Sequence, residues 1–148
     1  MTDIVFFWNP ETERIQTIEL GYFRVPPQLD IGALFSRLGR PNKVLMMFSP
    51  TESASGYEFI MFFPSSGAVL LLRAVLRDWR YLCLNGDELD GMDLLYLAKD
   101  ADPVAWARWS SYPLFDYYGD PREYLGVGQE ELIDQLEEPG GCIEIVNP

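Results

Sequence analysis

The sequence of 148 residues contains no histidine and only two lysines, Lys43 and Lys99. Histidine is the commonest general base and the commonest metal ligand, so its absence excludes every site built around it. A Ser/His/Asp or Cys/His site is therefore excluded, and a Ser/Lys site could use only one of these two lysines. We identify no catalytic, metal-binding or cofactor motif. The composition favours a protein that is not an enzyme, and catalysis by carboxylates or tyrosine is what it leaves open.

Cysteines and long apolar runs are also scarce. Cys83 and Cys142 are the two cysteines, far apart in sequence and each inside an apolar run. Because there is no sign of secretion, buried free thiols are favoured over a disulfide. The apolar run 4–8 is too short for a signal peptide and follows Asp3 instead of a basic region. No run approaches the roughly 18 apolar residues of a membrane span. We therefore expect a cytoplasmic protein.

Positive charge is missing from one part of the chain. Residues 1–86 contain eight acidic and eight basic residues, whereas residues 87–148 contain 15 acidic residues and only three basic ones. The whole net charge of −12 therefore lies in the second part. Direct binding to nucleic acid or to an anionic membrane is disfavoured, because phosphate contacts need cations. A basic protein partner is favoured, and the alternative is that the acidity only keeps the protein soluble.

What the sequence has in abundance is apolar side chains. They make up 48 % of the chain, and aromatic residues 14 %, which is enough for one folded domain over residues 1–148. Apolar and alternating runs predict strands. These runs are 3–8 and 14–20, joined as a hairpin, then 43–48, 57–63, 81–84 and 142–146, with a further element over 92–98. Helices between such strands predict an α+β fold, with an antiparallel or mixed β-sheet and about three helices packed against it.

Three segments predict helices. Residues 30–38 carry an apolar stripe after Asp30 as N-cap and before a glycine stop. Residues 127–138 end at a Pro-Gly-Gly sequence. Residues 67–79 read as a mostly buried helix, and a strand over 68–73 is the alternative for this apolar run.

Two of these helices would carry charged stripes with the same spacing. The basic stripe is Arg73, Arg77 and Arg80, and the acidic stripe is Glu130, Asp134 and Glu137. The stripes either lie side by side or are two separate solvated faces, since surface ion pairs contribute little.

The stretch 100–124 contains seven of the chain's 21 aromatic residues, set among carboxylates and broken by prolines. Its aromatic side chains either pack onto the core or form an exposed anchor for a partner. The candidates for the core are Trp106, Trp109, Phe115 and Tyr117. The candidates for the anchor are Tyr112, Tyr118 and one tryptophan, ringed by Asp116 and Asp120.

The segment 85–93 is rich in oxygen ligands. An EF-hand loop with Gly91 at its sixth position needs Asp at the first position and Glu at the twelfth, where this chain has Gly86 and Leu97. The segment is therefore better interpreted as a solvated acidic turn than as a metal site.

The acidic turn, the aromatic stretch and the last helix are expected to form one acidic surface with aromatic anchors at its centre. The predicted partner-binding residues are Asp87, Glu88, Asp90, Asp93, Trp109, Tyr112, Asp116, Tyr117, Tyr118, Asp120 and Glu123. Our leading hypothesis is a cytoplasmic inhibitor that blocks a basic protein surface, such as the cleft of a nucleic-acid-acting toxin or enzyme. Small bacterial immunity proteins and phage inhibitors are functional analogues.

Two alternatives belong to other classes. One is a structural or adaptor module that does not catalyse a reaction. The other is a carboxylate-based enzyme, for example one using Asp116 with Asp120 or Glu123, or a small-molecule sensor.

Overall fold

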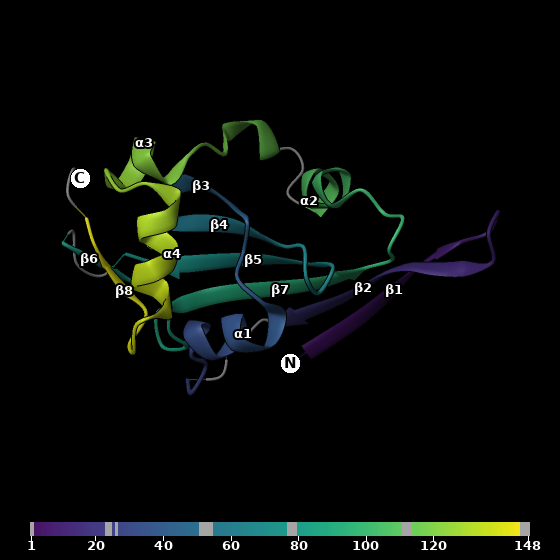
Figure 1. Ribbon diagram of the computed structural model, residues 1–148, viewed down its shortest axis with the longest axis horizontal. Helices are drawn as coiled ribbons and strands as arrows, with labels where there is room; N and C mark the ends of the chain where they lie inside the picture. The colour runs from purple at the N-terminus through teal and green to yellow at the C-terminus, as the bar shows by residue number, and fades with distance from the viewer. Residues whose placement is uncertain are drawn as a thin grey trace.

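A six-stranded antiparallel sheet forms the centre of the computed structural model, which describes residues 2–22, 25, 27–50, 55–76, 80–110 and 114–145 (Figure 1). Its strands lie in the order β1, β2, β7, β5, β4, β3. Their bounds are β1 Thr2–Asn9, β2 Arg14–Tyr22, β3 Lys43–Pro50, β4 Ser55–Phe63, β5 Ala68–Val75 and β7 Leu89–Leu97. A second sheet pairs β6 (Tyr81–Cys83) with β8 (Cys142–Glu144). The predicted N-terminal hairpin is confirmed as β1 and β2.

The helices of the described residues are α1 Ile31–Leu38, α2 Pro103–Ser110, α3 Pro121–Leu125 and α4 Gln129–Glu137, with a 3-10 turn, η1, at Phe115–Tyr117. They confirm the α+β fold. The predicted cap of α1 is also confirmed, because the backbone N–H of Gly32 donates to Asp30 Oδ1 at 2.9 Å. Within the described residues, no helix is long and apolar enough to span a membrane.

Both faces of the sheet are buried at its centre. Alternate residues of β4 enter two separate cores, with Phe59 and Met61 in the first and Ile60 and Phe62 in the second. The first core also contains the apolar sides of α1 and α4, and the second contains residues of α2 and η1. α4 crosses the strands on one side of the sheet in Figure 1. Helices therefore cover both faces, and α4 and α2 lie on opposite sides.

This burial overturns the predicted helix over residues 67–79. Residues 68–75 form β5, a central strand between β4 and β7, so the alternative interpretation was right and the helix was wrong. A strand covered on both faces reads as a continuous apolar run without alternation, which periodicity cannot separate from a buried helix. Residues 77–79, including Arg77, lie outside the described residues.

The predicted free thiols are also wrong. Cys83 and Cys142 form a disulfide, and they stand directly opposite each other in the pairing of β6 with β8, with Cα atoms 4.0 Å apart. Neither side chain is fully buried. The two cysteines are 59 positions apart in sequence, and no local pattern indicated that the two short strands are neighbours.

Candidate functional site

The segment from η1 to α4 closes the β3 edge of the sheet. Gly119 exchanges backbone hydrogen bonds with Met46, at 2.8 and 3.0 Å. At the start of α4, the side-chain amide of Gln129 accepts from Val44 N–H at 2.9 Å and donates to Asn42 O at 3.0 Å. This amide offers the donor and acceptor that the peptide group of a neighbouring strand would offer. These bonds pair the outer side of β3 around Val44 and Met46, and they fix the segment of α3 and α4 against it.

α4 presents an acidic face to solvent. Leu132, Ile133 and Leu136 on its inner side have no solvent exposure, and they fix the helix against the first core. The exposed carboxylates at its outer side and C-terminus are Glu130, Glu131, Asp134, Glu137 and Glu138. The charged groups therefore stand on a rigid support.

Arg40 is the cation that the structure places among these carboxylates. Its guanidinium group lies 2.7 Å from Asp134 and 3.1 Å from both Glu130 and Glu137. Hydrogen bonds to Asp134 and then to Glu130 raise the pKa of Arg40 above its usual value. The acidic stripe thus faces Arg40. Of the predicted basic stripe, Arg73 belongs to β5 and Arg77 lies outside the described residues. Because all four side chains are well exposed, these pairs add little to stability.

α3 extends the acidic face of α4. Asp120 Oδ1 accepts from Arg122 N–H at 2.9 Å and caps the helix. Glu123 lies close to Gly119, where a Cβ atom would stand 2.8 Å from Glu123 Oε2. A surface hollow lined by Asp120, Arg122, Glu123, Gly128 and Gln129 joins α3 to the start of α4.

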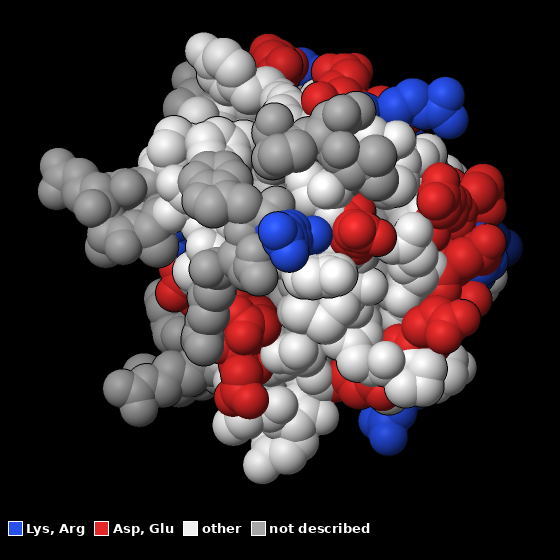
Figure 2. Space-filling model, turned by 90° about the vertical axis from the view of Figure 1, so that its left-hand side faces the viewer, with Lys and Arg blue, Asp and Glu red and all other residues white. Residues whose placement is uncertain are grey.

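We call this region the α3–α4 acidic surface. It consists of Asp120, Glu123, Glu130, Glu131, Asp134, Glu137 and Glu138, together with Arg40 and Arg122. Seven carboxylates against two guanidinium groups leave a local charge of −5. Figure 2 looks onto the end of the molecule where α3 and α4 lie, and it shows acidic side chains gathered along one side with few basic ones between them.

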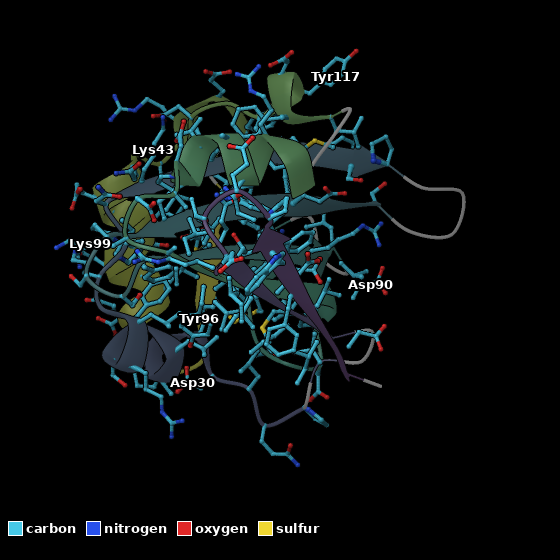
Figure 3. All side chains as sticks on the ribbon, turned by 90° about the vertical axis from the view of Figure 1, so that its right-hand side faces the viewer. Asp30, Lys43, Asp90, Tyr96, Lys99 and Tyr117 are labelled. Carbon is cyan, nitrogen blue, oxygen red and sulfur yellow. A yellow bond between two sulfur atoms is a disulfide. The ribbon has the colours of Figure 1, made fainter. Side chains whose placement is uncertain are left out.

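Tyr117 and Asp116 lie next to this surface, on η1. Tyr117 is 69 % exposed and points outward at the top of Figure 3. Its carbonyl accepts from the hydroxyl of Tyr124 on α3, at 3.0 Å. Asp116 lies 3.5 Å from Arg108, while Asp120 caps α3, so these two carboxylates have separate partners. One interpretation of the sequence placed Tyr117 in the core, while our list of predicted partner-binding residues included it, and in the structure its side chain is exposed.

The other aromatic residues of the stretch pack inward where they are described. Trp106 and Phe115 pack against the second core, as one interpretation predicted. Tyr118, a candidate anchor, is half-buried there too, and its hydroxyl donates to Glu58 Oε2 at 2.7 Å. The side chain of Trp109 and the whole of Tyr112 lie outside the described residues.

Asp90 and Asp93 lie on the strand β7 and not on the α3–α4 acidic surface. Asp90 pairs with Arg73, whose Nε also lies 3.8 Å from Glu58 Oε1. Asp93 Oδ1 lies over Gly21, 3.0 Å from the place that a Cβ atom would occupy there. Burial raises the pKa of Asp93, and burial together with the charge of Asp93 raises the pKa of Glu19 on β2.

The predicted site residues therefore fall into three groups. Asp87 and Glu88 lie in the turn between β6 and β7, while Asp90, Asp93 and Tyr118 contact the sheet. Asp116, Tyr117, Asp120 and Glu123 lie along η1 and α3. Figure 3 shows Asp90 and Tyr117 well apart. Among the predicted residues that the structure describes, those that lie beside the carboxylates of α4 are the ones on η1 and α3.

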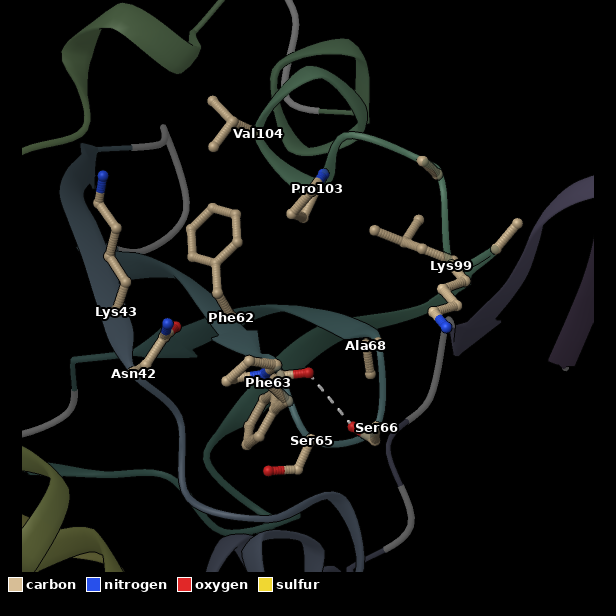
Figure 4. A pocket seen from close by; sticks show the side chains of 15 residues that line it. Asn42, Lys43, Phe62, Phe63, Ser65, Ser66, Ala68, Lys99, Pro103 and Val104 are labelled. Atoms are coloured by element: carbon tan, nitrogen blue, oxygen red, sulfur yellow. Dashed lines mark hydrogen bonds between the residues drawn. The ribbon is translucent and has the colours of Figure 1, made fainter.

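A cavity of about 560 Å³ lies between the turn from β4 to β5 and the segment that leads from β7 into α2 (Figure 4). Its lining includes Phe62, Pro103 and Val104, and both lysines of the chain. Lys43 and Lys99 stand on opposite sides of it. They are 56 residues apart in sequence, and neither was predicted as functional.

Within the described residues, no group of three or more His, Cys, Asp or Glu side chains is placed to hold a metal ion. Comparison with protein-family models, with curated proteins and with solved structures found no significant match.

Proposed function

We propose that this protein binds a basic surface of another protein and blocks it, as an immunity-type or phage-type inhibitor of a nucleic-acid-acting toxin or enzyme would. The observation that carries the proposal is the α3–α4 acidic surface, with its local charge of −5. An enzyme that acts on nucleic acids presents cations to phosphate groups, and the same cations attract an ordered row of carboxylates.

The support beneath this surface suits a binding role. α4 is fixed by three fully buried side chains, and Gln129 ties its first turn to β3. Carboxylates on a rigid helix lose little conformational entropy when a partner binds. Tyr117, exposed beside α3, offers the aromatic contact that protein interfaces favour at their centre.

The test compares two charge reversals of equal size. The variant Glu130→Lys with Asp134→Lys alters the α3–α4 acidic surface, and Glu11→Lys with Glu13→Lys alters the exposed turn between β1 and β2. Each changes the net charge from −12 to −8. Proteins that bind to the immobilised wild-type chain are captured from extracts of the source cell at low salt, identified and purified. Their cleavage of nucleic acid is then measured without added chain, and with the wild-type chain or each variant added.

We expect a basic protein that is inhibited by the wild-type chain and by the control variant, but not by the α4 variant. Binding should weaken as salt rises, because exposed charges are screened. Capture of no protein at low salt, or equal inhibition by both variants, would contradict the proposal. Binding that survives high salt would favour the adaptor alternative.

The cytoplasmic location belongs to the same proposal. The disulfide between Cys83 and Cys142 weighs against it, because cytosolic thiols are kept reduced. Alkylation of the chain in freshly lysed cells, without added reductant, decides the matter. Modification of both cysteines supports a cytoplasmic protein, and protection of both rejects it.

The cavity in Figure 4 favours a second candidate function, the binding of a small organic anion. An apolar floor with an ammonium group on each side suits a carboxylate that carries an apolar chain. Titration with octanoate, followed by nuclear magnetic resonance, should shift the signals of Phe62 and Ala68. Lys99→Met should reduce the shifts, and signals that do not move would reject this function.

A further inference from the structure

The first strand of the chain is an exposed apolar edge. β1 is the last strand of the six-stranded sheet on the side opposite β3, and no other described segment pairs with its outer side. Ile4, Phe6 and Trp8 are 57 %, 59 % and 57 % exposed, although they are among the most apolar side chains. Their alternation places all three on one face of the sheet.

The neighbouring strand widens this apolar strip. Trp8 stands opposite Ile15 of β2, which is 45 % exposed, and Phe6 stands opposite Ile18. The turn of the hairpin extends beyond the body of the molecule in Figure 1. On the other face, Phe7 packs against Trp106 with ring centroids 4.9 Å apart, which fixes the hairpin to α2. A fixed, open and apolar edge is a template for pairing with another strand.

We propose that β1 pairs in an antiparallel manner with β1 of a second copy of this chain, joining two sheets into one. Side chains directly opposite each other in an antiparallel pair point to the same face, so a two-fold axis must pass beside one residue. With Phe6 on the axis, Phe6 faces its own copy and Ile4 faces Trp8 of the second copy. Asp3 then faces Asn9 of the second copy.

This register is the reason why we propose a second copy of the chain as the partner of β1. Asp3 is the only charged residue of β1, and the register sets it opposite an amide instead of another carboxylate. If Val5 were on the axis, Asp3 would face Phe7 of the second copy. Each apolar side chain of the exposed face meets an apolar side chain, so the strand is complementary to itself. A basic partner would find a single carboxylate along it.

The charge of the two copies sets how the dimer should respond to salt. Each chain carries −12, so two copies repel each other and meet best along a nearly neutral edge. Salt screens this repulsion, so the dimer should strengthen as salt rises. The complex proposed for the α3–α4 acidic surface should weaken with salt, so the two proposals fail independently.

The dimer should be reversible. Specific stable interfaces involve about 20–30 residues on each side, whereas the proposed contact is centred on one strand of eight residues from each copy. The fraction of dimer should therefore rise with protein concentration. Sedimentation velocity over a wide concentration range, at low and high salt, measures it.

Phe6→Lys is the disrupting variant, because it sets two ammonium groups opposite each other on the axis and in the middle of the edge. Leu114→Lys is the matched control, since Leu114 is also an exposed apolar residue, at 39 %, and lies outside β1. We expect complete loss of the dimer in Phe6→Lys and no change in Leu114→Lys. A wild-type chain that stays monomeric, or a dimer that survives Phe6→Lys, would overturn the proposal.

A second measurement tests the register and does not depend on the stability of the lysine variant. Phe6→Cys should form a disulfide between two copies under mild oxidation, because the residue faces itself across the axis. Asn9→Cys should not, because the two new cysteines would lie about 20 Å apart, six residues of strand at 3.3 Å each. Equal cross-linking of both variants, or of neither, rejects this pairing.

Discussion

The two edge strands of the central sheet differ in whether the rest of the chain covers them. β3 is closed by the backbone of Gly119, by the side-chain amide of Gln129 and by α3, all from the last third of the chain. β1, at the other edge, exposes Ile4, Phe6 and Trp8, and no described segment pairs with its outer side. Within one sheet, the first edge is completed inside the chain and the second is left open.

The two edges also differ in the chemistry of their side chains. The segment that closes β3 also carries the carboxylates of α3 and α4, so the covering of one edge becomes an acidic surface. The open edge is nearly uncharged and apolar. A charged surface and an apolar edge attract different partners and respond to salt in opposite directions.

The largest expected difference between the edges concerns their contribution to stability. Leu132→Ala removes a fully buried side chain that fixes α4 and should lower the free energy of unfolding by about 2–5 kcal/mol. Ile4→Ala removes a side chain that is 57 % exposed and should change it by less than about 0.5 kcal/mol in the monomer. Urea unfolding at low protein concentration measures both. Equal losses would show that the β1 edge is packed as well as the β3 edge.

A smaller effect tests the amide that closes β3. Gln129→Leu leaves Val44 N–H and Asn42 O without their partner and should cost about 1–3 kcal/mol. The same change at Gln135, whose amide has a single long contact of 3.5 Å with Glu131, is the control and should cost less.

Hydrogen exchange localises this effect. In Gln129→Leu, the amide of Val44 should exchange faster than in the wild-type chain, while the amides of β5 should not change. An unchanged rate at Val44 would mean that Gln129 does not close the edge.

The smallest effect concerns the pairing of β2 with β7, which joins the hairpin to the rest of the sheet. Asp93 on β7 lies beside β2 there. Burial raises the pKa of Asp93, so the folded state favours the protonated carboxyl and is weakened when that carboxyl is charged. Asp93→Asn should therefore stabilise the fold at neutral pH, by less than about 1 kcal/mol because solvent screens the group.

The gain should disappear as the pH falls through the raised pKa of Asp93 toward its usual value, since the carboxyl then becomes neutral in the wild-type chain as well. Urea unfolding at a series of pH values measures the difference. Asp100→Asn, at an exposed position, is the control. A gain that is constant over the whole range would mean that the charge of Asp93 is not its cause.

The local features of the fold could be read from the sequence, and the long-range features could not. The hairpin and α1 were predicted, because turn residues, alternation and the cap at Asp30 act over a few positions. β5 was mistaken for a helix because burial on both faces hides the alternation of a strand. The disulfide was missed because pairing of β6 with β8 brings distant residues together.

The candidate site was predicted in its charge but not in its arrangement. The acidity of the second part of the chain placed Asp120 and Glu123 on the acidic surface, but α2 and α4 proved to cover opposite faces. Arg40 and Gln129 act through contacts with residues between 85 and 97 positions away in sequence, and no local pattern marks them. Tyr117 and Tyr118 were both predicted to bind a partner, but the 3-10 turn directs the ring of Tyr117 outward and the ring of Tyr118 onto the sheet.

The position of β2 between β1 and β7 has a consequence for folding of the chain during its synthesis on the ribosome. Thr17 pairs with Leu97, which is synthesised 80 residues later. The hairpin therefore emerges, with Ile4, Phe6 and Trp8 uncovered, long before the strand that docks it exists. During that interval both outer sides of a two-stranded ribbon are open, and such ribbons are only marginally stable in water. The first two strands of the nascent chain are thus most at risk of pairing with other chains. Synthesis of β7 covers the free side of β2, while the outer side of β1 stays unpaired by any described segment.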